Sequence, residues 1–248
     1  MMASNAEMDI TFDFRSDTPE GKDPDVFSPT LRQYHQKLWS KSLPGGASFA
    51  LDAITPRSYL HHKSALGEFF LASDSVIPTF TRHVRMAHIV AEVPTERREE
   101  FRRLSYTIGG MMLFPGNKID GRMTINGARG CHPLIRDRFD LTVECIRRHY
   151  MGASSPLADV LYRYDDFFRL FGDFRGYVDF FHLQDIVSEN GSGVLFATEF
   201  NEFKSPIVPR DVDEYVKYMQ AAESFVRGRN ARIARALTRP ASARSPDT

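Results

Sequence analysis

The stretch that decides the fold reads IGGMMLFPGNKIDGRMTINGARG over residues 108–130 and CHPLIRDRFDLTVECIRRHY over residues 131–150. Two short apolar runs are broken at Pro115-Gly116-Asn117 and again at residues 126–130, and such turn residues bound strands. We therefore predict strands at residues 109–114 and 122–126, followed by a long helix from about residue 132 to residue 150. A loop that runs from a strand into a helix start brings backbone donors and charged side chains to a ligand, so this stretch also predicts a site.

Outside this stretch, the pattern places short strands mainly in the first half of the chain and longer, aromatic-rich helices in the second half. The predicted strands lie at residues 10–14, 48–51, 59–62, 68–71 and 194–200, and the predicted helices at residues 29–40, 79–93, 94–104, 156–170, 174–183 and 211–237. Together these elements predict an α+β fold, with a small mixed or antiparallel sheet packed by several helices.

The length of the chain bounds its domain organisation. A chain of 248 residues with 42% hydrophobic and 26% charged residues has the composition of a globular protein and can bury one substantial core. We expect a flexible N-terminus over residues 1–7, a single compact α+β domain over residues 8–237 and a disordered tail over residues 238–248.

Charge and cysteine usage limit the classes of partner. The 32 basic and 32 acidic side chains cancel, so there is no overall field to attract nucleic acid, apart from weak contacts by the arginine-rich tail. The two cysteines, Cys131 and Cys145, do not form a disulfide framework or a metal-binding pattern. The polar, acidic N-terminus lacks an export signal, and no apolar run is long enough for a membrane. We therefore expect a soluble, cytoplasmic protein that makes no membrane contact.

Several blocks of the sequence are similar to a known family. These blocks are FDFRSDTPEGKDPD (residues 12–25), SPTLRQYHQKLWSK (28–41), YLHHKS (59–64), LGEFFLASDS (66–75), TIGGMMLFPGN (107–117), TINGARG (124–130), DRFDLTVECIRRHY (137–150) and FGDFRGYVDFF (171–181). The chain resembles a family of uncharacterised bacterial proteins over roughly residues 12 to 235. The resemblance implies a free-standing bacterial protein, and it carries no established activity and no assigned catalytic residues.

The strongest cluster of candidate site residues surrounds the predicted helix at residues 132–150. Side chains four residues apart on a helix share one face, so Asp140 and Glu144 lie in a row with neighbouring arginines. We expect Arg129, with Asn126 and Arg147, to bind anionic oxygens, because guanidinium groups pair well with phosphate and carboxylate. Glu144 and Asp140 are the predicted catalytic acid and base. The structural alternative is a solvated helix face with intrahelical ion pairs.

A second group of candidates lies in the first third of the chain. Arg15 and Asp17 belong to a polar, proline-rich loop that can fold over a pocket, and Asp74 follows a phenylalanine-rich strand. We expect these three residues to contact a ligand. His61 and His62 are adjacent on a predicted strand and point to opposite faces, so we interpret them as structural rather than as metal ligands.

The motifs exclude several classes of enzyme. The glycine spacing matches neither a phosphate-binding loop nor a dinucleotide fingerprint, and there is no G-x-S-x-G nucleophile motif. The sequence indicates no metal site and names no cofactor. Two functions remain. The first is a small intracellular enzyme or sensor, for example a transferase, that acts on a phosphate-bearing, nucleotide-like ligand through the arginine and acid cluster. The second is a non-catalytic protein-interaction module with a charged helix face.

Overall fold

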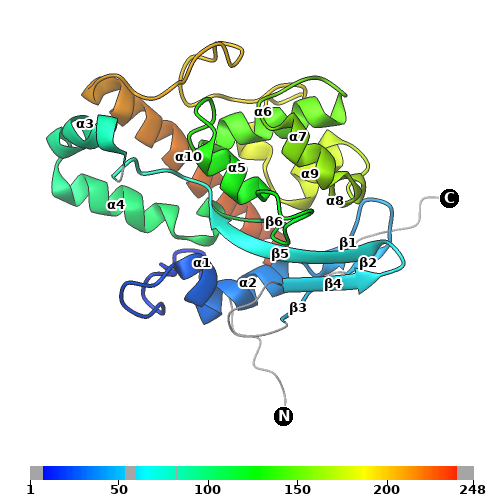
Figure 1. The fold of residues 1–248 in the computed structure, drawn as a ribbon. Helices are drawn as coiled ribbons and strands as arrows, with labels where there is room; N and C mark the ends of the chain where they lie inside the picture. Colours follow the sequence, from blue (N-terminus) through cyan, green and yellow to red (C-terminus); the bar gives the residue numbers. More distant parts are fainter. Residues whose placement is uncertain (1–7, 54–59, 82, 239–248) are drawn as a thin grey trace.

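The computed structural model describes residues 8–53, 60–81 and 83–238 (Figure 1). The predicted flexible N-terminus, residues 1–7, and the predicted tail beyond Thr238 lie outside the described residues. The helices are α1 (Pro24–Phe27), α2 (Pro29–Trp39), α3 (Ala87–Glu92), α4 (Thr95–Ser105), α5 (Ile125–Cys131), α6 (Phe139–Tyr150), α7 (Ala158–Arg163), α8 (Asp165–Arg169), α9 (Phe174–Phe180) and α10 (Val212–Thr238). The strands are β1 (Lys41–Ser42), β2 (Ser48–Phe49), β3 (Asp52–Ala53), β4 (Leu60–Ser64), β5 (Gly67–Ser75) and β6 (Met111–Pro115). Short 3-10 helices are η1 (Val84–Met86), η2 (Ile108–Gly110) and η3 (Gln184–Ile186).

The centre of the fold is a four-stranded sheet in the order β3-β4-β5-β6, and all of its neighbouring strands are antiparallel. Strand β5 is the longest and lies between β4 and β6, where Asp74 is opposite Met112. In Figure 1, α1 and α2 lie below β5, and α5 and α6 lie above it. The α+β fold predicted from the sequence is confirmed, and the sheet is antiparallel.

Local signals explain why several elements begin where they do. Helix α2 begins at Pro29, after Ser28 has accepted a hydrogen bond from the Leu31 amide, which is the cap that the Ser-Pro pair predicts. The predicted helices at residues 94–104 and 211–237 correspond to α4 and α10, and the predicted strand at residues 109–114 is β6. Short-range capping and periodicity thus located these elements to within two residues.

Three predicted strands are wrong. Residues 10–14 form turns, and the Phe14 amide donates to the Tyr106 carbonyl rather than to a neighbouring strand. Residues 122–126 are not a strand, because Thr124 caps a helix there and accepts from the Gly127 amide. Residues 194–200 contribute only an isolated bridge between Val187 and Val194.

Several predicted helices are shorter than expected. The helix predicted at residues 156–170 is divided into α7 and α8, and the one predicted at residues 174–183 ends at Phe180. The helix predicted from residue 132 begins at Phe139, because Arg136 and Asp137 have φ values of 51° and 65° and break the helical path. The helix predicted at residues 79–93 is limited to η1 and α3. The later start of α6 places the Arg136–Asp137 pair in a loop.

The core is built from aromatic side chains, as the composition indicates. The rings of Phe171, Tyr177 and Phe181 pack together with centroids 5.0–5.3 Å apart, edge to face for Phe171 and Tyr177 and tilted for the other two pairs. The centroids of Trp39 in α2 and Phe181 lie 5.1 Å apart. Helix α10 is tied to the sheet by Arg229, which is buried and donates to the carbonyls of Gly109 and Met111. In the described part of the chain, none of the helices combines the length and the apolar character that crossing a bilayer requires.

Candidate functional site

A cleft of about 430 Å³ opens at the end of β5, where the strand meets α1 and the loop between α5 and α6. It is lined by Asp23, Asp25, Asp74, Ser75, Ile77, Pro78, Thr79, Phe80, Thr81, His83, Arg102, Tyr106, Gly130, Arg136 and Asp137. Most of these side chains come from loops and element ends, where polar groups are held by a rigid scaffold. Four aspartates in one cleft make carboxyl chemistry its main feature.

Asp74 is held in the cleft by Arg129. Residue 74 faces α5 from strand β5, and its carboxylate accepts a hydrogen bond from the Arg129 guanidinium. The same terminal nitrogen of Arg129 forms an ion pair with the Asp137 carboxylate at 3.0 Å, and the other two nitrogens donate to the Asp137 carbonyl at 2.7 Å and to the Thr142 hydroxyl at 3.3 Å. The Arg129 side chain is 0% exposed and does not line the cleft, so it holds Asp74 and the loop from the protein interior. The structure therefore places Arg129 in a helix interior rather than in the predicted loop.

Asp25 of α1 lines the same cleft as Asp74 and interacts with it electrostatically, so the two residues form a carboxyl pair. It accepts from the Ser73 hydroxyl at 3.0 Å and from the Ser75 amide at 3.2 Å, which are neutral donors on β5. Burial, followed by the nearby charge of Asp74, raises the pKa of Asp25 well above its usual range. Burial also raises the pKa of Asp74 to about 7, against the opposing charge of Arg129. Burial and nearby negative charge therefore favour the protonated forms of these two carboxyls.

Arg136 and Asp137 form a strained turn at the rim of the cleft. Both have positive backbone φ values, 51° and 65°, which residues other than glycine rarely adopt. Such backbone strain is often found at functional sites. Among the described residues, the Arg136 side chain has no hydrogen-bond or ion-pair partner. Its neighbour Asp137 is bound to Arg129. The turn thus presents a free guanidinium to the cleft from a fixed position.

Asn126, another predicted ligand contact, lies on α5 behind the strand. Its amide nitrogen is 3.5 Å from the Ser73 carbonyl, and its side-chain oxygen is buried without a partner among the described residues. Asn126 therefore belongs to the region around β5, although it does not line the cleft itself.

A second cavity of about 380 Å³ continues from the cleft, because Asp23, Arg102 and Tyr106 line both. Its other lining residues are Arg15, Thr18, Pro19, Glu20, Gly21, Lys22 and Pro24. The prediction that the loop after residue 14 folds over a pocket is consistent with this arrangement. Arg15 itself is bound to Asp13 at 2.7 Å and to Glu99 at 3.5 Å, and Lys22 lies 5.7 Å from the ring of Phe27.

Asp17, by contrast, supports the start of α2. Its carboxylate accepts from the Ser28 hydroxyl at 2.6 Å and from the Thr30 amide at 3.0 Å. These two bonds satisfy donors at the helix start, which is the ordinary work of a capping carboxylate. The geometry of Asp17 is that of a structural residue.

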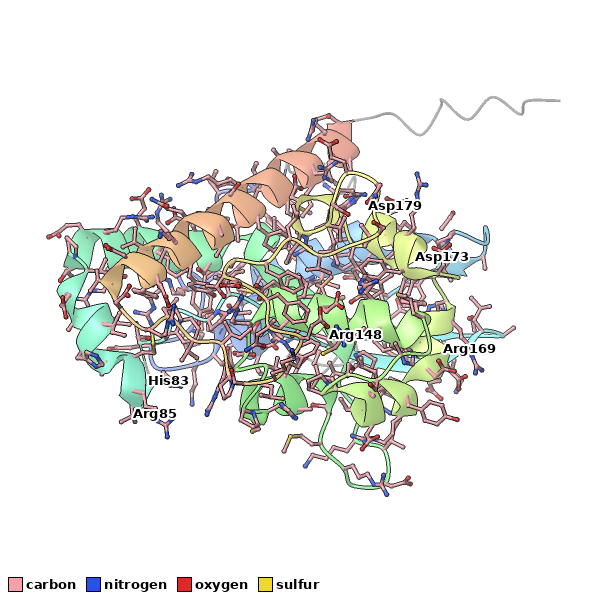
Figure 2. The ribbon with its side chains drawn as sticks, turned by 90° about the horizontal axis from the view of Figure 1, so that it is seen from above. His83, Arg85, Arg148, Arg169, Asp173 and Asp179 are labelled. Atoms are coloured by element: carbon pink, nitrogen blue, oxygen red, sulfur yellow. The ribbon has the colours of Figure 1, made fainter. Side chains whose placement is uncertain are left out.

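The acids of α6 lie in ion-pair networks and do not line the cleft. Glu144 is 2% exposed and accepts from Arg147 at 2.7 and 2.9 Å and from Arg148 at 2.7 Å. Arg148 continues the network to Glu202. Figure 2 shows Arg148 well apart from His83, which lines the cleft.

Asp140 is likewise part of a buried pair. It is 5% exposed, binds Arg138 and accepts from the amides of Leu141 and Ala197. Asp140 lines a different, largely apolar cavity of about 220 Å³ between α10 and the segment around residue 196. The structure therefore does not bring Asp140, Glu144 and Arg147 together with Arg15 and Asp74.

Two important groups escaped the sequence-based reasoning. Asp25 falls in the Asp-Pro-Asp run that predicts irregular structure, and only the fold places it against Ser73, 48 positions further along the chain. Arg136 falls inside the helix predicted at residues 132–150, and only the structure shows that it lies in a loop at the cleft. In the described residues, no three histidine, cysteine, aspartate or glutamate side chains are grouped in a way that could hold a metal ion.

Comparison with known proteins adds a family but no activity. A family model described as a family of unknown function (DUF6994) matches residues 8–233, so the chain belongs to that family. This confirms the resemblance to an uncharacterised family. No curated protein and no solved structure matches the chain. The function must therefore be argued from the cleft.

Proposed function

We propose that the protein is an enzyme that binds a small phosphate-bearing ligand, such as a nucleotide, in the cleft at the end of β5. In this proposal Asp25 and Asp74 act as an acid and base pair, and Arg136 binds the anionic group. The observation that carries it is the presence, in one cleft, of a carboxyl pair and a guanidinium that has no partner in the described part of the chain and is held by a strained turn.

The carboxyl pair supports catalysis rather than simple binding. A general acid or base works best when its pKa lies near the working pH, and the pKa of Asp74 is raised to about 7. Two neighbouring carboxyls that retain one proton can accept a proton from one reacting group and deliver a proton to another. We assign to the pair the deprotonation of an attacking hydroxyl or water and the protonation of a leaving group. Transferases and hydrolases share this pattern.

The basic side chains support an anionic ligand. Arg136 is unpaired at the rim, and Arg102 and Lys22 lie along the continuation of the cleft into the second cavity. Guanidinium groups bind phosphate through two parallel hydrogen bonds. Because Arg129 already offsets the charge of Asp74 and Asp137, the repulsion that a phosphate meets at the acidic end is reduced. In this proposal, a phosphate bound by these basic side chains leaves the rest of the ligand next to Asp25 and Asp74.

The alternative function, a protein-interaction module with the charged face of α6 as its interface, has less support. That interface requires exposed charges, whereas Asp140 and Glu144 are 5% and 2% exposed and already bound to arginines. The concave arrangement of polar groups at the cleft is also typical of a small-molecule site.

The proposal is tested by ligand binding to the purified protein. We would screen inorganic phosphate, nucleotides and sugar phosphates for an increase in the melting temperature, because a ligand that binds only the folded state stabilises it by mass action. Arg136→Ala should remove the shift that the best ligand produces. Arg122→Ala is the matched control, since Arg122 is exposed and does not line the cleft. If no phosphate compound shifts the melting temperature, or if both variants respond like the wild type, the proposed function is wrong.

A further inference from the structure

A chain of buried hydrogen bonds leads from the core to Asp25. Trp39 donates from its indole nitrogen to His35 Nδ1 at 3.0 Å, and His35 Nε2 lies 2.9 Å from the Ser73 hydroxyl. Ser73 in turn lies 3.0 Å from the Asp25 carboxylate. Trp39 and His35 are 0% and 1% exposed, so no solvent competes for these bonds.

The direction of every bond in the chain follows from the chemistry of Trp39. An indole nitrogen is a donor only, so His35 Nδ1 must be an unprotonated acceptor. Burial, assisted by the charge of Arg229, lowers the pKa of His35 to about 3, so the imidazole is neutral and carries its proton on Nε2. Nε2 therefore donates to Ser73, and the Ser73 hydroxyl donates to Asp25. His35 cannot accept a proton from Ser73, which excludes Ser73 as a histidine-activated nucleophile.

The two carboxyls of the pair have different partners. Asp74 is bound to a cation, Arg129, which favours its ionised form. Asp25 accepts from two neutral donors, the Ser73 hydroxyl and the Ser75 amide, and the structure gives it no cation partner among the described residues. These donors occupy one position on each carboxylate oxygen, on the side toward β5. A proton on Asp25 must then occupy one of the remaining positions, which face away from those donors.

We propose that Asp25 is the proton-bearing acid of the pair and Asp74 the ionised base, and that Ser73, His35 and Trp39 are positioning residues that hold Asp25 with its proton toward the cleft. The assignment rests on the proposed function for its catalytic purpose. The carboxyl that donates to the leaving group is thereby Asp25, and the carboxyl that accepts from the attacking group is Asp74. In one turnover the proton taken by Asp74 replaces the proton given by Asp25, so return to the starting state needs one transfer from Asp74 to Asp25.

The acidic groups around Asp25 agree with this assignment, since the charges of Asp74 and Asp23 favour its protonated form. The Arg129 cation acts in the opposite direction, but its hydrogen bond goes to Asp74 and not to Asp25. Burial, followed by the charge of Asp25, raises the pKa of Tyr106. The remaining titratable or charged groups of the cleft are His83, Arg102, Arg136 and Asp137.

The proton is located by NMR titration of the aspartate side-chain carboxyl carbons in the ligand-free protein. We expect the inflection of Asp25 at a higher pH than the inflection of Asp74. The opposite order overturns the assignment of acid and base. Because no ligand is present, this result is independent of the phosphate-binding test, so failure of the assignment is distinguishable from failure of the proposed function.

The positioning role is tested with two serine variants on the same strand. Ser73→Ala removes a hydrogen bond to the Asp25 carboxylate and should shift its inflection to higher pH. Ser75→Ala keeps the amide that binds Asp25 and should leave the inflection in place. Equal shifts of the inflection in the two variants would contradict the role of Ser73.

The nitrogen-15 chemical shifts of His35 test the direction of the hydrogen bonds. They should show a proton on Nε2 and none on Nδ1 between pH 5 and pH 9. A protonated Nδ1 would contradict the direction of the chain of hydrogen bonds.

Discussion

At the scale of single residues, Arg129 and Arg136 differ in burial, and this difference separates a structural arginine from the arginine that we propose binds the ligand. Arg129 is fully buried and its donors are occupied, whereas Arg136 is partly exposed and unpaired among the described residues. Arg129→Ala should lower the free energy of unfolding by about 3–5 kcal/mol, because it leaves the Asp74 carboxyl without its cation. Arg136→Ala should change it by less than about 0.5 kcal/mol. Chemical denaturation measures both. A stable Arg129→Ala variant that had lost only ligand binding would restore the ligand-contact role predicted from the sequence.

The raised pKa of Asp25 also predicts how stability depends on pH. The folded protein binds the proton of Asp25 more tightly than the unfolded chain does. The free energy of unfolding therefore falls as pH rises from the unfolded-state pKa of Asp25, about 3.9, toward its higher pKa in the folded protein. Asp25→Asn cannot ionise and escapes this cost. The difference in unfolding free energy between Asp25→Asn and the wild type should therefore increase in favour of the variant from pH 4 upward. A difference that stays constant or falls with pH would mean that Asp25 ionises normally in the fold.

At the scale of elements, the start of α2 depends on a carboxylate from another segment. Asp17 binds both the Ser28 hydroxyl and the Thr30 amide. Asp17→Ala should lower the free energy of unfolding by about 1 kcal/mol, the usual effect of losing a helix cap. Glu20→Ala, in the same loop but exposed, is the control and should have little effect. If Asp17→Ala is as stable as the wild type yet loses ligand binding, then Asp17 is a ligand contact after all.

The α5–α6 region shows the largest difference between local signals and structure. The sequence of residues 122–126 alternates like a strand, but Thr124 caps a helix, and the chain then turns at Arg136 and Asp137 before α6 begins. The helix that results places Arg129 against Asp74. A strand there would have carried the arginine on a loop, where it was expected.

At the scale of the whole molecule, α10 and the sheet are joined at η2 by close backbone packing. The Gly109 amide donates to Asn230 at 2.7 Å, and a Cβ at Gly109 would lie 2.5 Å from the Val226 carbonyl. Gly109→Ala should therefore lower the free energy of unfolding by about 1–3 kcal/mol through overpacking. Gly45→Ala is the matched control, because no atom lies within 4 Å of its added Cβ. Equal melting temperatures for the two variants would show that α10 can move away from η2 without a loss of stability.

The sequence by itself determined the features that depend on neighbouring residues. The cap at Ser28 and Pro29, the helical periodicity of residues 211–237 and the apolar run of β6 are local, and each was predicted within about two residues. The α+β class follows from the same signals, because strand and helix periods differ. Asp74 and the loop that carries Arg15 were also recognised as candidates, since polar residues at strand ends and in proline-rich loops have few structural duties.

The tertiary structure alone decided which of the charged residues meet. Arg129 binds Asp74 across 55 positions, and Asp25 meets Ser73 across 48. Such pairs leave no mark in the local sequence, because a charged side chain on a helix has the same pattern whether it faces water or a buried partner. Burial then sets the charge state of these side chains. Glu144 is held in ion pairs with Arg147 and Arg148, and Arg129 in ion pairs with Asp74 and Asp137. Burial also raises the pKa of Asp25 and Asp74, which line the cleft.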